Sequence, residues 1–305
     1  MGLTAMNGRF APSPTSGLHL GNLRTALAAW LFARSSGRGF VARVEDLDRD
    51  RVKAADGIAA GQLADLAALG IDFDGAPLWQ SDRLADYERA AAGLELYECF
   101  CTRKEIAEAA LAPHGDHRPY PGTCRDLTPA QRDAKRARRP PAWRVKVPAQ
   151  TTQTVRDYWA GESAGAVDDF VVRRNDGTWA YNFAVVVDDI AQGVDQVVRG
   201  ADLLSSAPRQ AWLTGRLGGR VPEYAHIGLV VSPGGERLSK RDAAVTLSDL
   251  AADGWTPGDV LALLGASLGL ASPGERVTAG RLLERFDPAL IPPGRWVWNG
   301  QRTPG

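Results

Sequence analysis

Two short stretches far apart in the chain carry residue types that suit the phosphates of a nucleotide. In the first, residues 12–22, two prolines exclude a helix, Gly17 allows a turn, and helical spacing of apolar residues begins after His19. Backbone N–H groups and the positive end of a helix dipole meet at such a turn. There His19 could donate a hydrogen bond to a phosphate, and Gly21 would leave room for an adenine ring. The alternative is a core helix with an incidental histidine.

The second stretch, residues 237–241, is a basic segment that follows a strand-like run and a glycine-containing turn. The chain contains 31 arginines and only 5 lysines, so the lysine at position 240 calls for an explanation. A compact ammonium on a flexible stem can follow phosphates as pyrophosphate departs, whereas a planar guanidinium fits that task less well. We therefore expect Lys240 on a mobile loop that closes over ATP. The alternative is a solvated basic turn.

Four polar side chains stand at the expected ends of strands: Arg9, Glu45, Tyr181 and Arg199. In an open α/β sheet, the carboxyl ends of the strands converge on one crevice. A carboxylate can hold an ammonium group, and an arginine can hold a carboxylate through two hydrogen bonds, so the set suits an amino acid. Two arginines favour a substrate with a side-chain carboxylate as well. Taken singly, each residue could instead belong to a structural ion pair.

The three cysteines lie within 26 residues, at Cys99, Cys101 and Cys124. An odd number argues against a complete disulfide framework, and clustered thiols in a reducing compartment more often bind metal. The spacing is that of a zinc site lacking one ligand. On chemistry alone the fourth ligand would be a histidine, either His114 or His117. Buried thiols that merely fill space are the alternative.

The apolar pattern predicts the elements that must position these residues. Residues 8–11 and 40–46 have the composition of buried strands, and residues 54–69 and 82–96 have the spacing of amphipathic helices. Gly70 provides a stop for the first helix. Alternating strands and helices are typical of a parallel sheet covered by helices. The predicted fold class is therefore α/β, with a Rossmann-type parallel sheet.

Residues 97–170 interrupt this alternation and predict an insertion that carries the zinc site. Beyond it, residues 170–183 predict a hairpin around an Asp-Gly turn, residues 194–198 resume the sheet, and residues 209–217 form a helix. The pattern after residue 245 is mostly helical. The predicted division is residues 1–96 for the first half of the catalytic domain, 97–170 for the insertion, 171–245 for the second half with the ATP loop, and 246–305 for a helical C-terminal segment.

Composition excludes several classes of protein. Hydrophobic content of 44% and charged content of 24% are ordinary for a soluble globular chain, and no apolar run reaches membrane-spanning length. No secretory signal is apparent, so we expect a cytoplasmic protein without a membrane partner. The net charge is zero, and contact with nucleic acid would therefore need a local basic face. The densest candidate comprises Arg132, Lys135, Arg136, Arg138, Arg139, Arg144 and Lys146. The alternative is an exposed helix end in an arginine-rich chain.

At this point a family resemblance becomes specific. Residues 12–22 resemble the "HIGH" motif, and residues 237–241 the "KMSKS" loop, of class I aminoacyl-tRNA synthetases. Residues 8–17 are similar to the opening of glutamyl-tRNA synthetases, residues 43–48 to their "RIEDTD" stretch, and residues 198–206 to their "RGEE" segment. The resemblance covers roughly residues 7 to 250, and the motifs are highly specific in combination.

Two features differ from a standard glutamyl-tRNA synthetase. The chain has no sequence for the large helical anticodon-binding region, and Val185 and Ile190 stand where the standard pattern has Asn and His. Both features resemble the truncated family of glutamyl-queuosine tRNA(Asp) synthetases, as do the cysteine spacing and Tyr120. That family's zinc ligands, carried onto this chain, would be Cys99, Cys101, Tyr120 and Cys124. His117 remains the rival fourth ligand.

The resemblance also implies roles for the other candidates. Glutamate would contact Arg9, Phe10, Ala11, Pro12, Ser13, Glu45, Tyr181 and Arg199. ATP would contact His19, Gly21, Asn22, Arg237, Leu238, Ser239, Lys240 and Arg241. Among these, Lys240 and His19 would be the catalytic residues.

The implied reaction is activation of L-glutamate by Mg²⁺-bound ATP to glutamyl-adenylate without tRNA. Alignment and cation density are all that this step asks of the protein, so no catalytic nucleophile is expected. Transfer of glutamate to the queuosine at the wobble position of tRNA(Asp) would follow, so the partner is the anticodon stem-loop that carries this base. Two alternatives stay open: a minimal synthetase that charges a tRNA 3′ end, and a catalytically silent nucleotide- or RNA-binding paralogue.

Overall fold

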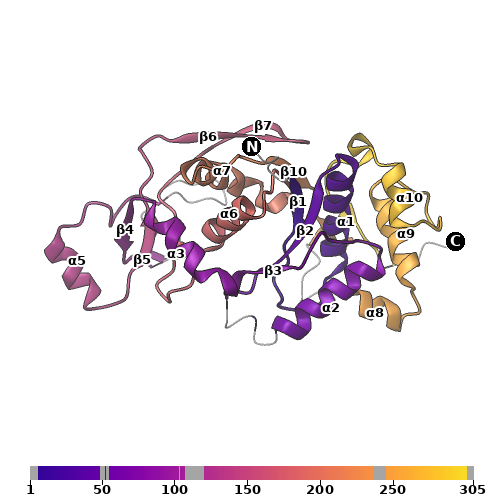
Figure 1. Cartoon of the computed structure of the whole chain (residues 1–305), viewed down its shortest axis with the longest axis horizontal. Coiled ribbons are helices and arrows are strands. Elements are labelled where there is room, and N and C mark those ends of the chain that lie inside the picture. The colour runs from indigo at the N-terminus through magenta and orange to yellow at the C-terminus, as the bar shows by residue number, and fades with distance from the viewer. Residues whose placement is uncertain are drawn as a thin grey trace.

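The computed structural model describes residues 6–48, 52, 55–102, 104–106, 120–236 and 245–300. The molecule is elongated, with a central α/β body between a small β-rich end and a helical end (Figure 1). None of the helices formed by these residues is long and apolar enough to cross a membrane.

Two sets of strands form the central sheet, and all their pairings are parallel except that of β6 with β7, which is antiparallel. The first set, in the order β1-β2-β3, comprises β1 (Asn7–Phe10), β2 (Gly39–Val44) and β3 (Leu78–Trp79). The second, in the order β7-β6-β10-β9, comprises β6 (Thr152–Asp157), β7 (Gly161–Ala166), β9 (Gln196–Gly200) and β10 (Glu223–Ile227). A parallel bridge between Asn7 and Val194 places β1 beside β9. The chain winds in opposite directions from this pair, and such a switch point is where doubly wound sheets bind ligands.

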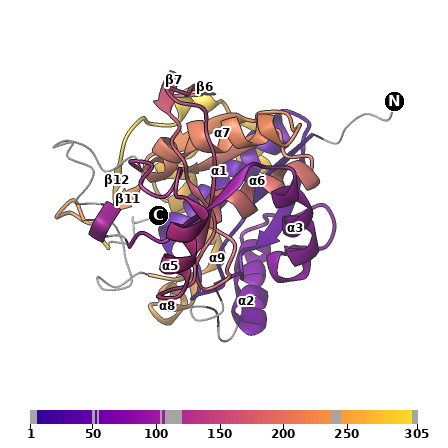
Figure 2. The ribbon, with the colours of Figure 1, turned by 90° about the vertical axis from the view of Figure 1, so that its left-hand side faces the viewer.

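Helices cover both faces of the sheet, which confirms the predicted fold class. They are α1 (Leu20–Ser35), α2 (Ala55–Ala68), α6 (Tyr181–Ala191) and α7 (Ala207–Arg216). Gly70 follows α2 with a φ of +77°, which suits a residue without a side chain and confirms the predicted stop. The hairpin of β6 and β7 lies over α7 (Figures 1 and 2).

Helix α1 is buried almost all round, because a second layer of helices covers the side that the sheet leaves open. This layer consists of α8 (Leu247–Ala252), α9 (Pro257–Ser267) and α10 (Ala279–Glu284). Leu27 and Leu31 of α1 share one hydrophobic cluster with Leu264 and Leu282 of this layer. The strands β11 (Val230–Val231) and β12 (Trp296–Val297) pair and tie the end of the chain to the catalytic body.

The β-rich end contains β4 (Leu96–Cys99), β5 (Ala142–Val145), β8 (Val171–Arg173) and α5 (Pro129–Arg136). These strands form a separate antiparallel sheet in the order β4-β5-β8. The predicted insertion, residues 97–170, is therefore built in two parts. Its second part, the hairpin of β6 and β7, joins the main sheet through the pairing of Asp157 with Tyr224 of β10.

Two predicted elements were wrong in part. The predicted helix 82–96 is a 3₁₀ turn η1 (Gln80–Arg83) followed by α3 (Leu84–Ala92), because Gly93 caps the helix and the chain turns into β4. The predicted hairpin 170–183 has only one bridge, between Arg173 and Trp179, before α6 begins at Tyr181.

Candidate functional site

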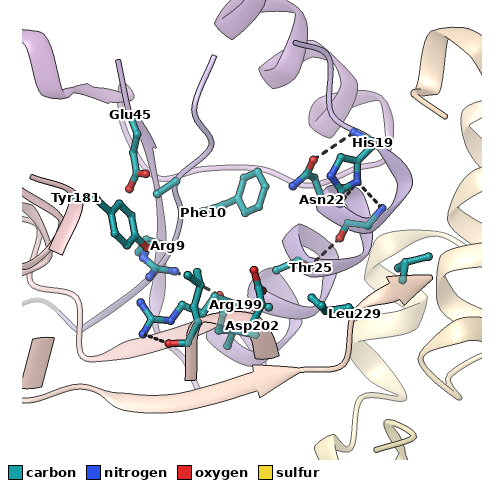
Figure 3. Close-up of a pocket in the computed structure, with 16 residues that line it drawn as sticks. Arg9, Phe10, His19, Asn22, Thr25, Glu45, Tyr181, Arg199, Asp202 and Leu229 are labelled. Atoms are coloured by element: carbon teal, nitrogen blue, oxygen red, sulfur yellow. Dashed lines mark hydrogen bonds between the residues drawn. The ribbon is translucent and has the colours of Figure 1, made fainter. Parts of the chain in front are cut away.

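A pocket opens at the carboxyl ends of β1 and β9, at the switch point of the sheet (Figure 3). It brings together nine of the residues expected from the sequence: Arg9, Phe10, Ala11, His19, Gly21, Asn22, Glu45, Tyr181 and Arg199. Pro12 and Ser13 are not among the residues that line it. Residues 237–241, including Lys240, lie outside the described residues. Phe10 lies between two sides of the pocket, with Arg9 and Glu45 on one side and His19 and Asn22 on the other.

The side of the pocket beside α1 is built by a capped helix start. His19 is the N-cap residue, and its Nδ1 accepts hydrogen bonds from the backbone N–H groups of Gly21 and Asn22, at 3.1 and 3.3 Å. The Asn22 side chain accepts in return from the backbone N–H of His19. Because Nδ1 accepts, the proton of the neutral ring is on Nε2, which is then a donor. This supports the expected donation by His19.

Gly21 has a second purpose that the sequence did not indicate. A Cβ at this position would lie 3.0 Å from Cε1 and 3.1 Å from Nδ1 of His19. Such contacts are tight, so the imidazole would have to shift by a few tenths of an ångström to make room for a side chain. The absence of a side chain at Gly21 therefore favours the observed position of His19 in the cap.

Both described flanks of the expected ATP loop lie at the same corner. Val230, before the loop, lines the pocket. After it, Val245 accepts a hydrogen bond from the N–H of Leu20 at 3.0 Å, and Thr246 forms a bridge with His19. The start of α1 is thus held between the two segments that border residues 237–244.

The opposite side of the pocket contains buried charges in a partly balanced network. Arg43 is fully buried and contacts Asp189 at 2.7 Å and Glu45 at 3.4 Å. Arg9 reaches the same Asp189 carboxylate through Nε at 3.5 Å and donates from Nη1 to the carbonyl of Val198. The Asp189 carboxylate is therefore shared by two arginines.

The pKa values of two groups in this network are shifted toward the neutral form, chiefly by burial. Burial lowers the pKa of Arg9, although Asp189 opposes the shift. Burial also raises the pKa of Glu45, although Arg43 and Arg9 oppose that shift. A shift toward the neutral form means that each charged form lacks full compensation. A ligand with an anionic group beside Arg9 and a cationic group beside Glu45 would stabilise the charged forms of both side chains.

Two carboxylates in this network were missed by the sequence analysis. Asp188 is fully buried and accepts from Arg83 at 2.7 Å and from Gln80 and Tyr87 at 2.8 Å each. Asp188 thus links η1 and α3 to α6, whereas the adjacent Asp189 pairs with Arg9 and Arg43 beside the pocket. The signal that could have found them is a pair of carboxylates directly after a buried apolar run.

Tyr181 and Arg199 reach the pocket in different ways. Tyr181 was expected at a strand end but is the first residue of α6, with 42% of its surface exposed. Arg199 stands in β9 as expected, and it is buried. Its Nη1 donates to Gln210 at 2.6 Å and its Nη2 to the carbonyl of Leu203 at 3.3 Å. Gln210 was also missed, because it comes from a helix that follows the strand.

The three cysteines come together at the β-rich end. Their sulfur atoms lie within 4.8 Å of one another, and those of Cys101 and Cys124 are 3.5 Å apart. The phenol oxygen of Tyr120 lies 3.4 Å from the sulfur of Cys99 and 3.7 Å from that of Cys101. Ligand atoms around one tetrahedral zinc, at about 2.0–2.3 Å from the ion, are separated by about 3.3–3.8 Å. The donor set therefore fits a metal ion. His114 and His117 lie outside the described residues.

The predicted basic face exists only in part. Lys135 and Arg138 are exposed in or just after α5, whereas Arg136 is paired with Glu98 at 2.7 Å. Arg144 was wrongly included: it is buried, and its guanidinium lies 3.7 Å from the ring centre of Tyr120. It is a cation beside the cysteine cluster and is not part of the surface.

Comparisons with known proteins agree with this geometry. The family described as "tRNA synthetases class I (E and Q), catalytic domain" matches residues 5–276. A "Glutamyl-Q tRNA(Asp) synthetase" from Nocardia farcinica is 55% identical over 295 residues, which cover 95% of this chain and 92% of the relative. One of the same description from Cutibacterium acnes is 57% identical over 310 residues, or 98% of this chain and 89% of the relative. The crystal structure of a glutamate-tRNA synthetase from Elizabethkingia anophelis superposes with a TM-score of 0.77 at 26% identity, over 96% of this chain and 68% of that one.

Proposed function

The chain belongs to the class I tRNA synthetases of the glutamate and glutamine type, and within them to the glutamyl-Q tRNA(Asp) synthetases; from this premise we propose its reaction. It is a ligase that activates L-glutamate with ATP in the absence of tRNA. It then transfers the glutamyl group to the queuosine at the wobble position of tRNA(Asp). The observation that carries the proposal is a pair of opposite charges, Arg9 and Glu45, that line one side of the pocket and are only partly compensated by Asp189 and Arg43, beside a helix start that suits phosphate.

Glutamate fits the charge deficit of the pocket. Its ammonium group would pair with Glu45, and its two carboxylates with Arg9 and Arg199, because a guanidinium offers two parallel donors to a carboxylate. Tyr181 would close the open side. The remaining contacts would come from Phe10 at the end of β1 and from the segment that follows it, at Ala11, Pro12 and Ser13.

ATP would lie on the far side of Phe10. The Nε2–H of His19 would donate to a phosphate, and the start of α1 at Gly21 and Asn22 would provide backbone N–H groups and the positive dipole end. The loop residues Arg237, Leu238, Ser239, Lys240 and Arg241 would cover the triphosphate. Lys240 would follow the negative charge that moves onto pyrophosphate.

The first step is an in-line attack of the glutamate α-carboxylate on the α-phosphorus of ATP. The bond from this phosphorus to the bridging oxygen breaks, pyrophosphate leaves with the electron pair, and glutamyl-adenylate remains. Mg²⁺ bound with ATP would screen the phosphates. The chain's own residues align the two reactants and provide cations where charge develops, which is the main requirement of such a displacement.

The second step is attack of a hydroxyl group of queuosine on the activated carbonyl. AMP leaves, and an ester of glutamate forms on the base. The acceptor would be an anticodon loop, and the exposed Lys135 and Arg138, in and just after α5, would provide a local basic surface for its phosphates. Because tRNA and reduced thiols are found in the cytoplasm, we expect the protein there.

A zinc ion held by Cys99, Cys101, Tyr120 and Cys124 would be structural. All four tetrahedral positions would be filled by protein, so none is open for water. Its contribution would be to fix β4 to the loop that carries Tyr120 and Cys124. This would keep the small sheet rigid beside the catalytic body.

Pyrophosphate exchange in the absence of tRNA tests the first step. With Mg²⁺-ATP and labelled pyrophosphate, we expect exchange that depends on L-glutamate. Absence of exchange would instead support a silent paralogue of the family.

The acceptor is tested with two forms of tRNA(Asp). We expect glutamate to be transferred to native tRNA(Asp) that carries queuosine and not to the unmodified transcript. Charging of the transcript would show a minimal synthetase acting on the 3′ end. Periodate is unsuitable for this comparison because it destroys both the terminal diol and the queuosine diol.

A further inference from the structure

A buried chain of three side chains runs across three neighbouring strands behind the pocket. Asp157 ends β6, His226 lies in β10, and Arg199 lies in β9, and each is at most 6% exposed. The Asp157 Oδ2 lies 2.6 Å from Nδ1 of His226, and Nε2 of His226 lies 3.0 Å from Nε of Arg199. Three residues far apart in sequence thus form one continuous hydrogen-bonded line.

The chemistry of the arginine fixes every proton in this line. The Nε–H of Arg199 can only donate, so Nε2 of His226 must accept and the imidazole proton must be on Nδ1. That proton is donated to Asp157. Asp157 is itself held by backbone N–H groups, from His226 at 3.0 Å on Oδ2 and from Trp159 and Ala160 on Oδ1. Only the neutral Nδ1–H form of the imidazole satisfies both neighbours.

The two terminal nitrogens of the Arg199 guanidinium are also held by hydrogen bonds. Nη1 donates to Gln210 and Nη2 to the carbonyl of Leu203, and the ring of Tyr224 lies 5.4 Å below the group. Of the five N–H donors of Arg199, three are therefore engaged by described residues. One N–H remains on each terminal nitrogen, and the group lines the pocket (Figure 3).

We propose that Asp157 and His226 are positioning residues, which orient Arg199 so that its two remaining N–H groups meet a carboxylate of the substrate. The proposal rests on the glutamate-activating function proposed above. A guanidinium held in this way offers donors only. These donors suit a carboxylate of the substrate. The strand β6, which carries Asp157, thus contributes to substrate binding through His226 and Arg199.

The test is pyrophosphate exchange without tRNA, with the KM for glutamate and the KM for ATP measured separately. In His226→Leu the acceptor for Arg199 is lost, and we expect the KM for glutamate to rise about 10- to 100-fold, as for loss of a charge-assisted hydrogen bond. The KM for ATP should change less than about twofold. His226→Gln, whose amide oxygen can still accept, should recover most of the affinity. Asp157→Asn should resemble His226→Leu, because the asparagine NH₂ group favours the wrong tautomer.

Asp195→Asn is the matched control. Asp195 is as deeply buried as His226 and pairs with Arg38 at 2.8 Å, but it lies just before β9, at the opposite end of the strand from Arg199. This variant loses a buried ion pair and should lose stability, while its KM for glutamate stays as in the wild type. Far-UV circular dichroism checks that each variant is folded.

The pH dependence of the wild type provides a measurement that needs no variant to fold. The charged and titratable groups around His226 are Asp157 from β6, Arg199 from β9, Tyr224 on its own strand and Arg9 from β1. Burial lowers the pKa of His226, so the neutral form persists to more acidic pH than the usual value of about 6.5. Below that range a second ring proton would face the Nε–H of Arg199. At such acidic pH we expect the KM for glutamate to rise more steeply in the wild type than in His226→Gln, in which only the protonation of Glu45 remains to raise it.

The outcomes separate the two proposals. A wild-type protein without glutamate-dependent exchange overturns the proposed function, and the positioning role falls with it. An active wild type with an unchanged KM for glutamate in folded His226→Leu overturns the positioning role alone. An equal rise in both KM values would also overturn it, because that pattern indicates general damage to the pocket.

Discussion

The catalytic pocket and the cysteine cluster compensate their charges in different ways. In the pocket, the fully buried Arg43 has the carboxylate of Asp189 at 2.7 Å, and fully buried Asp188 has Arg83 at the same distance. In the cluster, three thiols and a phenol face one another. The cation that the described structure places beside them, Arg144, lies over the ring of Tyr120.

Contacts within the protein hold the pocket in shape, whereas the cysteine cluster would depend on the proposed metal ion to hold its donors together. Strand ends and paired charges keep the pocket in shape and leave a defined deficit at Arg9 and Glu45. In the cluster, three of the distances between donor atoms are 3.4–3.7 Å, as around a tetrahedral ion, and an ion would hold the donors together. Removing parts of each site should therefore have different consequences.

The largest effect is expected for the metal. We expect about one zinc per chain and complete loss of it in the Cys101→Ser, Cys124→Ser double variant, because structural zinc contributes on the order of 10 kcal/mol to the fold around it. Elemental analysis measures the zinc. Hydrogen exchange should show faster opening of β4 and β5, while β1, β2 and β9 keep their protection. Zinc that persists in the double variant would mean that its ligands lie elsewhere.

Breaking the paired charges of the pocket should cost less. Asp188→Ala leaves the donors of Arg83, Gln80 and Tyr87 without their shared acceptor and removes a carboxylate that lies 4.0 Å from the fully buried Arg43. We expect a loss of about 3–5 kcal/mol in the free energy of unfolding. Urea denaturation measures it.

Asp133→Ala is the control for this variant, because its pair with Arg136 is largely exposed and should contribute at most about 1 kcal/mol. Equal losses of unfolding free energy in Asp188→Ala and Asp133→Ala would show that the buried network stabilises the protein no more than an exposed ion pair does.

Lys240→Ala tests the part of the pocket that comes from the sequence alone. A cation that acts mainly on the charge developing in the transition state should affect the rate more than the binding of glutamate. We expect pyrophosphate exchange to slow about 10²- to 10³-fold, with little change in the KM for glutamate. An unchanged rate would contradict the assignment of the loop.

The smallest effect is expected for the neighbour of the cluster. Arg144→Met keeps a long apolar side chain over Tyr120 but removes the charge, and the apparent affinity for zinc should fall about 10- to 100-fold, as for other partners outside the ligand set. Competition with a chelator measures it. Lys146→Met is the control, because Lys146 pairs with Glu95 at the surface. Equal changes in zinc affinity in the two variants would show that Arg144 has no specific effect on the metal site.

Sequence patterns predicted this site well where local spacing decides the position. Arg9 lies near the end of one recognisable strand, Glu45 follows another, and His19 follows a turn, so their convergence depends mainly on the sheet being parallel. Tyr181 was misplaced because the apolar run 183–187 is buried on every side, and such a run satisfies helical and extended patterns equally. Arg144 was misplaced because a cation in an arginine-rich stretch gives no local sign of burial.

The contacts behind the pocket could not be predicted from spacing. Asp157 and His226 are 69 residues apart and meet because β6 pairs with β10. Nothing in either segment indicates that pairing. Helix α1 gives a similar case, since Arg24 donates to Ser267, 243 residues away. Such contacts between distant segments can be identified only once the three-dimensional arrangement of the strands and helices is known.

The contact between Arg24 and Ser267 bears on the order in which the chain can fold during synthesis. Arg24, 1% exposed in the helix that starts at His19, donates to the side chain and carbonyl of Ser267 and to the carbonyl of Gly228, and burial lowers its pKa to about 10. During translation α1 is synthesised long before α9. Until Ser267 has been added, the Arg24 guanidinium lacks two of the three acceptors that allow it to be buried. The corner expected to hold ATP, although encoded among the first residues translated, would be among the last parts of the enzyme to mature.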